Sequence, residues 1–301
     1  MRSRQLEARP ECVGSVLHRG VAVATRTLRC PPDGPVASEG EVRDEARNRV
    51  SDLVLVDVAD GIALITLNRP EARNALSSDM LTQLAGHMAG LDARTDVDVL
   101  VLTGAGRAFC AGLDLKEMAA SGANIRPGDG RPWPQLAKPL IGAVNGAAVT
   151  GGLELALACD FLVASDQARF ADTHTRVGLV PFWGMSVLLP QAVGVRVARE
   201  MSLTGNFMAA DEACRVGLVN RVVPHDELLT VARALAADIA SAEPAATRVL
   251  VAEYAGFSGG GSAALADEIR TAEAFLGAGI DPVLIEQRRI ALLERARQQA
   301  G

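Results

Sequence analysis

The sequence lacks several features that mark other classes of protein. No apolar run in its 301 residues approaches the roughly 18 residues that span a bilayer, so we expect no contact with membranes. The five cysteines are scattered and form no CxxC pair, which disfavours a disulfide framework and a metal site. A net charge of −6 without a basic stripe argues against a nucleic-acid partner. These absences predict a cytoplasmic protein.

The first 51 residues differ in composition from the rest of the chain. They contain prolines, glycines and a charged run over residues 39–49, and they show no sustained apolar periodicity. We expect residues 1–51 to be a disordered extension of a folded core. With 49% apolar residues, the chain can bury a substantial core.

Apolar patterning predicts strands and a helix directly after this extension. The runs Leu53–Val58 and Ile62–Leu67 flank Asp60-Gly61, which is a strong signal for a β-hairpin. Ser77 can cap the helix that follows, because apolar residues recur after it at helical spacing. Val97–Leu102 is typical of a buried strand.

Strands and helices alternate through the middle of the chain, and helices dominate its end. We expect strands at Leu140–Val144 and Phe161–Ala164, with a helix at Gly151–Cys159 between them. The later elements that we expect are a strand at Val219–Val223 and helices at Asp226–Ser241 and Val283–Gln299. This order predicts an α/β core followed by a helical C-terminal part.

Two glycine-containing segments, residues 103–114 and 145–160, each follow a predicted strand. Small residues let a ligand approach the main chain closely. Gly151-Gly152 at a helix start also leaves unpaired N–H groups that can receive an oxyanion. Taken alone, such glycines are also compatible with ordinary turns. Neither segment is a phosphate-binding loop, because the GxxxxGK[ST] pattern is absent.

These segments resemble motifs of the crotonase (enoyl-CoA hydratase/isomerase) superfamily. Residues 109–118, FCAGLDLKEM, are similar to its FxAGxDxKEM segment. Residues 138–160 resemble its KPxIAAVxGxAxGGGxELAxxCD segment, and residues 68–76 resemble its NRPxxxNAL element. Residues 203–223 match its LTG…AxxAxxxGLVxxVVP pattern. The similarity covers about residues 52–257 in the right order and spacing.

The resemblance implies a fold and an assembly. The fold would be a spiral of repeated ββα turns over residues 52–257, with C-terminal helices in residues 258–301 that mediate trimerisation. The chain would then form a homotrimer or a dimer of trimers.

The resemblance also implies an acyl-CoA substrate, with no cofactor apart from the coenzyme A that belongs to the substrate. The N–H groups of Ala111 and Gly151 would hold the thioester oxygen. The residues implied in binding the substrate are Arg73, Ala111, Gly112, Leu113, Asp114 and Gly151. Hydration of a 2-trans-enoyl-CoA would then give a 3-hydroxyacyl-CoA.

Glu154 is the candidate acid and base. It is the only charged residue between Gly151 and Cys159, and its neighbours on the predicted helix are apolar. Burial would raise its pKa towards neutrality, which suits a group that takes a proton from water and returns one to carbon. The alternative is that Glu154 has no catalytic role and is a carboxylate in the first turn of a helix, where the helix dipole stabilises it.

His174 occupies the position at which hydratases of this family usually carry a second glutamate. Histidine relays protons near neutral pH, so we treat His174 as a candidate catalytic residue, although Glu154 could also act alone. A histidine that makes ordinary loop hydrogen bonds is the other interpretation. Nearby Asp172 has no motif that supports a role.

A second departure lies at Phe182 and Trp183, where the family has a small and flexible PGxGG turn. We expect these rings to reshape the acyl pocket, or else to pack in the core. The same superfamily contains double-bond isomerases, thioester hydrolases and decarboxylases, and His174 leaves these activities open. A non-catalytic CoA-binding or RNA-binding homologue is a further alternative.

Overall fold

The computed structural model describes residues 52–121, 130–258, 262–277, 279 and 281–298. The extension expected over residues 1–51 lies outside the described residues.

An antiparallel hairpin opens the described chain. Strand β1 (Val54–Ala59) pairs with β2 (Ile62–Leu67), and Asp60 and Gly61 form the turn. Both turn residues have positive φ, at 53° and 76°, which is the conformation that a two-residue type I′ turn requires. The predicted hairpin is therefore confirmed.

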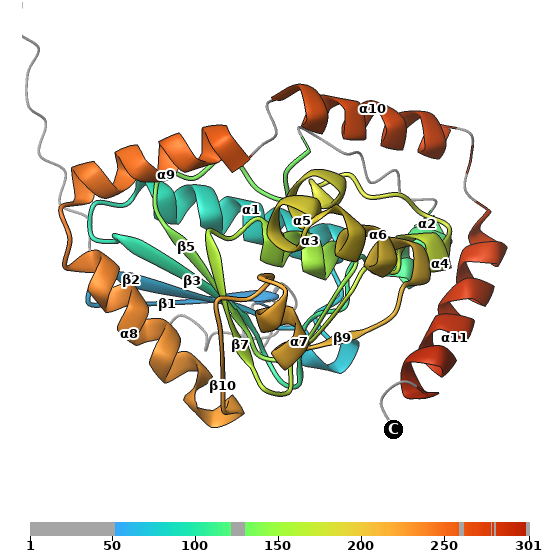
Figure 1. Cartoon of the computed structure of the whole chain (residues 1–301), viewed down its shortest axis with the longest axis horizontal. Helices are drawn as coiled ribbons and strands as arrows, with labels where there is room; N and C mark the ends of the chain where they lie inside the picture. Colours follow the sequence, from blue (N-terminus) through green and yellow to red (C-terminus); the bar gives the residue numbers. More distant parts are fainter. Residues whose placement is uncertain (1–51, 122–129, 259–261, 278, 280, 299–301) are drawn as a thin grey trace, which may run out of the picture. The chain divides into compact units, whose positions relative to one another are not determined.

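Two sheets build the core (Figure 1). The larger sheet has the order β1-β2-β3-β5-β7-β10, and every pairing after the hairpin is parallel. Its further strands are β3 (Val99–Gly104), β5 (Leu140–Val144), β7 (Phe161–Ser165) and β10 (Arg221–Val223). The smaller sheet consists of β4 (Ala108–Cys110), β6 (Ala147–Val149), β8 (Arg169–Ala171) and β9 (Met208–Ala209).

Consecutive strands alternate between the two sheets, and a helix follows each pair. The units are β3-β4-α2, β5-β6-α3 and β7-β8-α4, which confirms the repeated ββα order that the resemblance implies. Their helices are α2 (Leu115–Ser121), α3 (Gly151–Leu157) and α4 (His174–Val177). Because parallel strands present the same ends at one edge of a sheet, the repeats bring the starts of these helices to one region.

Helix α1 (Ser78–Ala93) follows the predicted cap. The Ser77 side chain accepts a hydrogen bond from the Met80 N–H, and the helix buries Met80, Leu84 and Met88 in the core. At its other end, the buried Nζ of Lys138 donates to the carbonyls of Leu91 and Arg94, whose oxygens lie 2.7 and 2.5 Å away. This ammonium satisfies carbonyl groups that the helix cannot bond internally.

Helix α8 (Leu228–Ala240) covers the other face of the larger sheet (Figure 1). Its Leu228, Ala232 and Ala236 pack against sheet residues that include Val101 and Ile141. The remaining elements of this part are α5 (Met185–Val193), α6 (Val195–Thr204), α7 (Ala210–Arg215) and the 3-10 turns η2 (Pro70–Ala72) and η3 (His225–Glu227).

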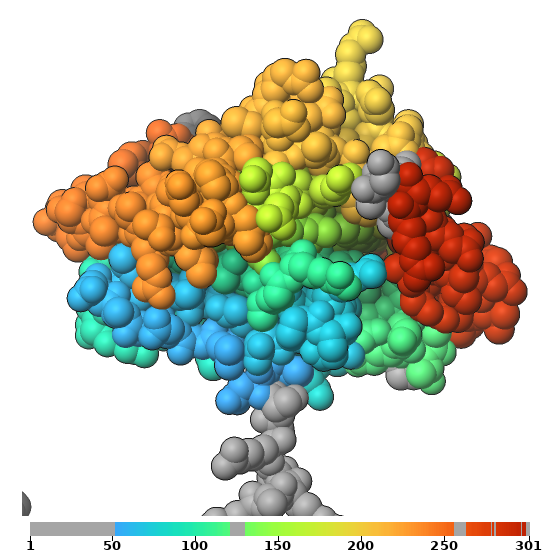
Figure 2. Space-filling view, turned by 90° about the horizontal axis from the view of Figure 1, so that it is seen from below, coloured from blue at the N-terminus to red at the C-terminus, as the bar shows by residue number. Residues whose placement is uncertain are grey.

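Three helices end the described chain: α9 (Pro244–Ser258), α10 (Ser262–Gly277) and α11 (Pro282–Gln298). Helix α10 packs on α5, and α11 packs on α2 and α4. Figure 2 shows α11, in red, on the side opposite to the orange region that contains α8. The predicted helical ending is confirmed. None of the described helices is long and apolar enough to cross a membrane.

Candidate active site

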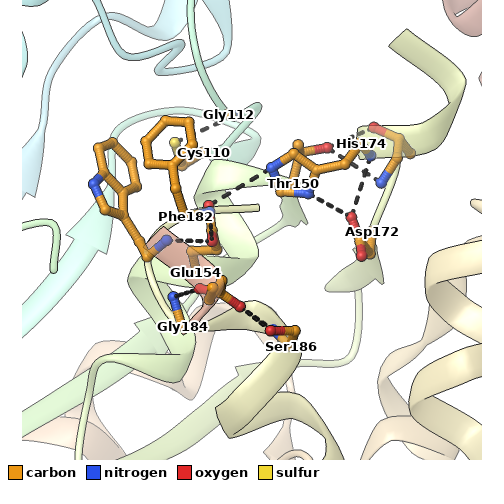
Figure 3. Close-up of polar contacts among 12 residues, drawn as sticks. Cys110, Gly112, Thr150, Glu154, Asp172, His174, Phe182, Gly184 and Ser186 are labelled. Atoms are coloured by element: carbon orange, nitrogen blue, oxygen red, sulfur yellow. Dashed lines mark hydrogen bonds and ion pairs between the residues drawn. The ribbon is translucent and has the colours of Figure 1, made fainter. Parts of the chain in front are cut away.

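Glu154 lies in the first turn of α3 with its side chain 1% exposed. Its Oε1 accepts hydrogen bonds from the backbone N–H groups of Trp183 at 2.8 Å and Phe182 at 3.2 Å (Figure 3). The segment that leads into α5 therefore holds one carboxylate oxygen in place. The other oxygen, Oε2, faces His174.

Burial raises the pKa of Glu154 to about 7. The nearby positive potential of His174 and the Trp183 N–H oppose this effect, whereas the carboxylates of Glu268 and Asp172 add to it. A carboxyl with a pKa near neutrality exchanges protons readily at physiological pH. This is the environment that the apolar sequence around Glu154 predicts.

His174 joins Glu154 to Asp172. Its Nε2 lies 3.7 Å from Oε2 of Glu154, and its Nδ1 lies 2.7 Å from Oδ1 of Asp172. All three side chains are buried. Although burial lowers the pKa of His174, the hydrogen bond to Asp172 and the nearby carboxylates outweigh it, so the pKa is raised. Sequence reasoning gave Asp172 no role, because no motif includes it.

Asp172 stays ionised beside His174. Burial raises the pKa of its carboxyl, but the hydrogen bond and charge of His174 outweigh burial, and the pKa is lowered overall. A carboxylate that accepts a hydrogen bond from Nδ1 fixes the proton on that nitrogen and orients the ring. Asp172 thus turns Nε2 of His174 towards Glu154.

The Ala111 N–H does not serve as predicted, because it donates to the carbonyl oxygen of Arg73 at 3.0 Å. Leu113 replaces it. Among the hydrogen bonds of the described residues, the Leu113 N–H has no acceptor, and neither does the N–H of Gly151 at the start of α3. A methyl group placed on Gly151 would lie 3.6 Å from the Leu113 nitrogen, so the two residues that carry the free donors are close neighbours.

Thr150 sets the direction in which α3 begins. Its φ of 55° and ψ of −115° are strained for a residue with a side chain. The conformation is held by the Thr150 N–H, which donates to the Ala171 carbonyl, and by a 2.5 Å hydrogen bond between the hydroxyls of Thr150 and Thr173. These contacts tie the start of α3 to the segment that leads to Asp172 and His174.

Two buried asparagines hold the backbone turn that precedes Leu113. The side-chain amide of Asn74 donates to the carbonyls of Ala105, Ala108 and Phe109. Asn145 accepts from the Gly104 N–H and donates to the Gly106 carbonyl. Sequence reasoning assigned neither residue a role, although both stand within the motifs NAL and VNG.

The predicted substrate-binding residues are spread around this site. Arg73 is exposed, and its carbonyl engages Ala111. Asp114 forms an ion pair with Arg69, at 2.6 Å, and caps α2 through the Lys116 N–H. Gly112 has a φ of 89°, and a side chain there would meet the Val149 carbonyl at 2.9 Å, so this position requires glycine.

Phe182 and Trp183 are both buried beside the site. Their rings are 5.1 Å apart in an edge-to-face arrangement. Cζ3 of Trp183 lies 3.6 Å from the position of a methyl group on Gly151. Trp183 also lines a cavity of about 640 Å³ that Trp133, Leu188 and other mostly apolar residues enclose. The indole therefore contacts both the start of α3 and this cavity.

Cys110 lies beside the site and is buried. Burial raises the pKa of the Cys110 thiol to about 12, so a nucleophilic thiolate is disfavoured there. Among the described side chains, no group of three or more His, Cys, Asp or Glu is placed to hold a metal ion.

Known proteins are similar to most of the folded chain. A family model described as enoyl-CoA hydratase/isomerase matches residues 57–272. A probable peroxisomal enoyl-CoA hydratase of Arabidopsis thaliana is 46% identical over 181 residues, which are 58% of this chain and 68% of that protein. A probable enoyl-CoA hydratase of Mycobacterium tuberculosis is 42% identical over 201 residues, 65% of this chain and 78% of that protein.

Solved structures agree with the sequence relatives. The crystal structure of an enoyl-CoA hydratase from Mycobacterium avium has a TM-score of 0.71 and 50% sequence identity to this chain. The match covers 75% of this chain and 98% of that one.

Proposed function

The chain belongs to the enoyl-CoA hydratase/isomerase family, and from this premise we propose that it adds water to a 2-trans-enoyl-CoA to give a 3-hydroxyacyl-CoA. The observation that supports this most is a buried Glu154 with a pKa near 7, on the helix whose first N–H is free. Relatives at 42–46% identity carry the name enoyl-CoA hydratase.

The free N–H groups of Leu113 and Gly151 form the proposed oxyanion hole. Attack of water on C3 moves the electrons of the double bond towards the thioester oxygen, which becomes negative in the enolate. Two preorganised donors stabilise that charge, and removal of one such donor typically costs roughly 3–4 kcal/mol of activation free energy. Both donors belong to the backbone, so the proposed role needs no functional group from the side chain of residue 113 or 151.

Glu154 and His174 supply the proton transfers in this proposal. The Glu154 carboxylate takes a proton from water as the water oxygen bonds to C3. The enolate carbon C2 then takes a proton from the Glu154–His174 pair, which returns to its original proton count. The two residues face each other at 3.7 Å and are buried, so their proton exchange is shielded from bulk water.

Product identification tests this function. The purified protein is incubated with crotonyl-CoA and, separately, with a 3-enoyl-CoA. A hydratase removes the conjugated thioester absorbance and forms the 3-hydroxy product from the first substrate. Conversion of the 3-enoyl substrate alone would show a double-bond isomerase instead, and binding without turnover would show a CoA-binding homologue.

Phe182 and Trp183 are proposed to restrict the acyl group. The Trp183 ring lies beside Gly151 and lines the cavity of about 640 Å³, and it would thus separate the proposed thioester position from that cavity. A short or compact acyl group would fit in front of the indole, and a long straight chain would require the ring to move. Turnover across C4 to C16 enoyl-CoA substrates tests this, and a flat profile would count against it.

We propose a homotrimer, or a dimer of trimers, as the assembled enzyme. Support comes from apolar side chains left exposed on the C-terminal helices, including Val249 at 58%, Tyr254 at 66% and Val283 at 65%. Light scattering of the purified protein measures the mass directly. The cytoplasmic location stays a prediction from the sequence, and the Arabidopsis relative is named as peroxisomal.

A further inference from the structure

Glu268 of α10 is a buried carboxylate outside the site described above, 7% exposed. Its Oε1 accepts a hydrogen bond from the Gly184 N–H at 2.6 Å, and its Oε2 accepts one from the Ser186 N–H at 2.7 Å. The Ser186 hydroxyl donates to the same Oε2. Glu268 thus binds three donors with both oxygens.

These donors belong to the start of α5. The first N–H groups of a helix have no partner within the helix, and the preceding residue here, Gly184, has no side chain to cap them. A carboxylate at this end also interacts favourably with the helix dipole. Glu268 therefore caps the start of α5, although it belongs to a helix that is distant in sequence.

The same short segment holds Glu154. The N–H groups of Phe182 and Trp183 donate to Glu154, and those of Gly184 and Ser186 donate to Glu268. Residues 182–186 therefore lie between two buried carboxylates. Figure 3 shows Glu154 beside Phe182, with Gly184 and Ser186 on the turn that follows.

We propose that Glu268 is a positioning residue for Glu154, acting through the backbone of residues 182–186. This inference rests on the proposed hydratase function. It makes α10 part of the catalytic apparatus, although α10 contributes no group to the reacting atoms. Glu268 also adds a negative charge near Glu154; the other charged groups that face Glu154 are His174 and Asp172.

The variant Glu268→Gln tests the inference. A glutamine has one acceptor oxygen and no charge, so either the Gly184 or the Ser186 N–H loses its partner. We expect kcat for crotonyl-CoA hydration to fall about 10-fold or more with KM within about threefold, because small misplacements of a catalytic group cost up to roughly 10²-fold. The acid limb of the kcat profile should move to lower pH, since a like charge near Glu154 is removed.

Two further variants keep the test decisive. Glu273→Gln removes an exposed carboxylate from the same helix, α10, so its kcat and pH profile should match those of the wild type. Glu268→Asp keeps the charge, so it should recover part of kcat and keep the acid limb in place, which a merely structural role would not require.

The outcomes separate this inference from the proposed function. A wild-type protein that does not hydrate enoyl-CoA defeats the function itself. A hydratase whose Glu268→Gln variant keeps kcat and the acid limb within error overturns only the role of Glu268. If Glu268→Gln does not fold, a Glu268→Asp variant that folds with a lowered kcat, an unchanged KM and the wild-type acid limb supports the positioning role, and one whose KM rises in parallel with the fall in kcat overturns it.

Discussion

The Nδ1 atom of His174 lies 2.7 Å from Oδ1 of Asp172, and both side chains are almost fully buried. This pair, together with Glu154, forms a chain of three ionisable groups within the candidate active site. In the family's motif, a glutamate usually stands at the position that His174 occupies in this chain. Here a histidine fixed by an aspartate takes up the position, so the proposed proton relay contains an imidazole in place of a second carboxylate.

Asp172→Asn should lower kcat by roughly 10-fold or more, because the amide no longer fixes the Nδ1 proton or stabilises the imidazolium. Asp172 raises the pKa of His174, so its loss lowers that pKa. His174 would then lose its proton at lower pH, so the basic limb of the plot of kcat against pH should move to lower pH. Asp96→Asn, at an exposed ion pair, is the control and should leave the profile unchanged. An unmoved basic limb in Asp172→Asn would contradict the orienting role.

The wild-type rate should rise with pH through about 7. Glu154 acts as a base only when ionised, and burial raises its pKa to about 7, so protonation abolishes its function below that value. The measurement is kcat against pH with crotonyl-CoA in buffers of constant ionic strength. The apparent value belongs to the coupled pair of Glu154 and His174. A rate that is flat from pH 5 to 8 would exclude Glu154 as the titrating base.

Gly151→Ala should fold and lose activity. Its methyl group would make ordinary contacts of 3.5–3.6 Å with Gly112, Leu113 and Trp183, and it would crowd the Leu113 nitrogen, one of the two proposed oxyanion-hole donors. We expect kcat/KM to fall by roughly 10²-fold or more, as for loss of an oxyanion-hole donor. Thermal unfolding should stay close to that of the wild type.

The neighbouring glycine offers a contrasting variant. A methyl group on Gly152 would lie 2.1 Å from the Cys110 carbonyl oxygen, so Gly152→Ala should fail to fold. Full activity of Gly151→Ala would show that the thioester oxygen binds elsewhere.

Trp183→Leu should extend the range of acyl chains. Removal of the indole joins the space beside Gly151 to the cavity of about 640 Å³, so kcat/KM for C10 to C16 substrates should rise relative to C4. Phe170→Leu is the matched control, since Phe170 is buried, lies outside the proposed site and does not line the cavity. An unchanged chain-length profile in Trp183→Leu would mean that the indole only packs the core.

Sequence patterning predicted the strands of the larger sheet and the helices α1, α3, α8 and α11, because their apolar patterns are clear. The short strands β4, β6 and β8 were not predicted, since three residues carry too little periodicity to be distinguished from loops. The resemblance indicated Glu154 and Gly151, whereas the free donor at Leu113 became visible only from the bond between Ala111 and Arg73. Asp172 bonds to His174 only two residues away, but no motif marks that pair, and Glu268 reaches Gly184 through a tertiary contact that no local pattern encodes.

The substitution Glu154→Gln tests the central claim most directly. A glutamine oxygen can still accept the Phe182 and Trp183 N–H groups, so the fold should persist. Since burial raises the pKa of Glu154, the ionised carboxylate destabilises the native state as pH rises through about 7, and the variant should be at least as stable at pH 8. Glu253→Gln on the exposed surface of α9 is the control.

The decisive measurement is the single-turnover rate of crotonyl-CoA hydration by Glu154→Gln, with thioester affinity determined on the same sample. The acid–base role of Glu154 predicts a rate lowered by roughly 10²–10⁴-fold at nearly unchanged affinity, the range typical of a lost general acid–base group. A rate within a few fold of the wild type would contradict it.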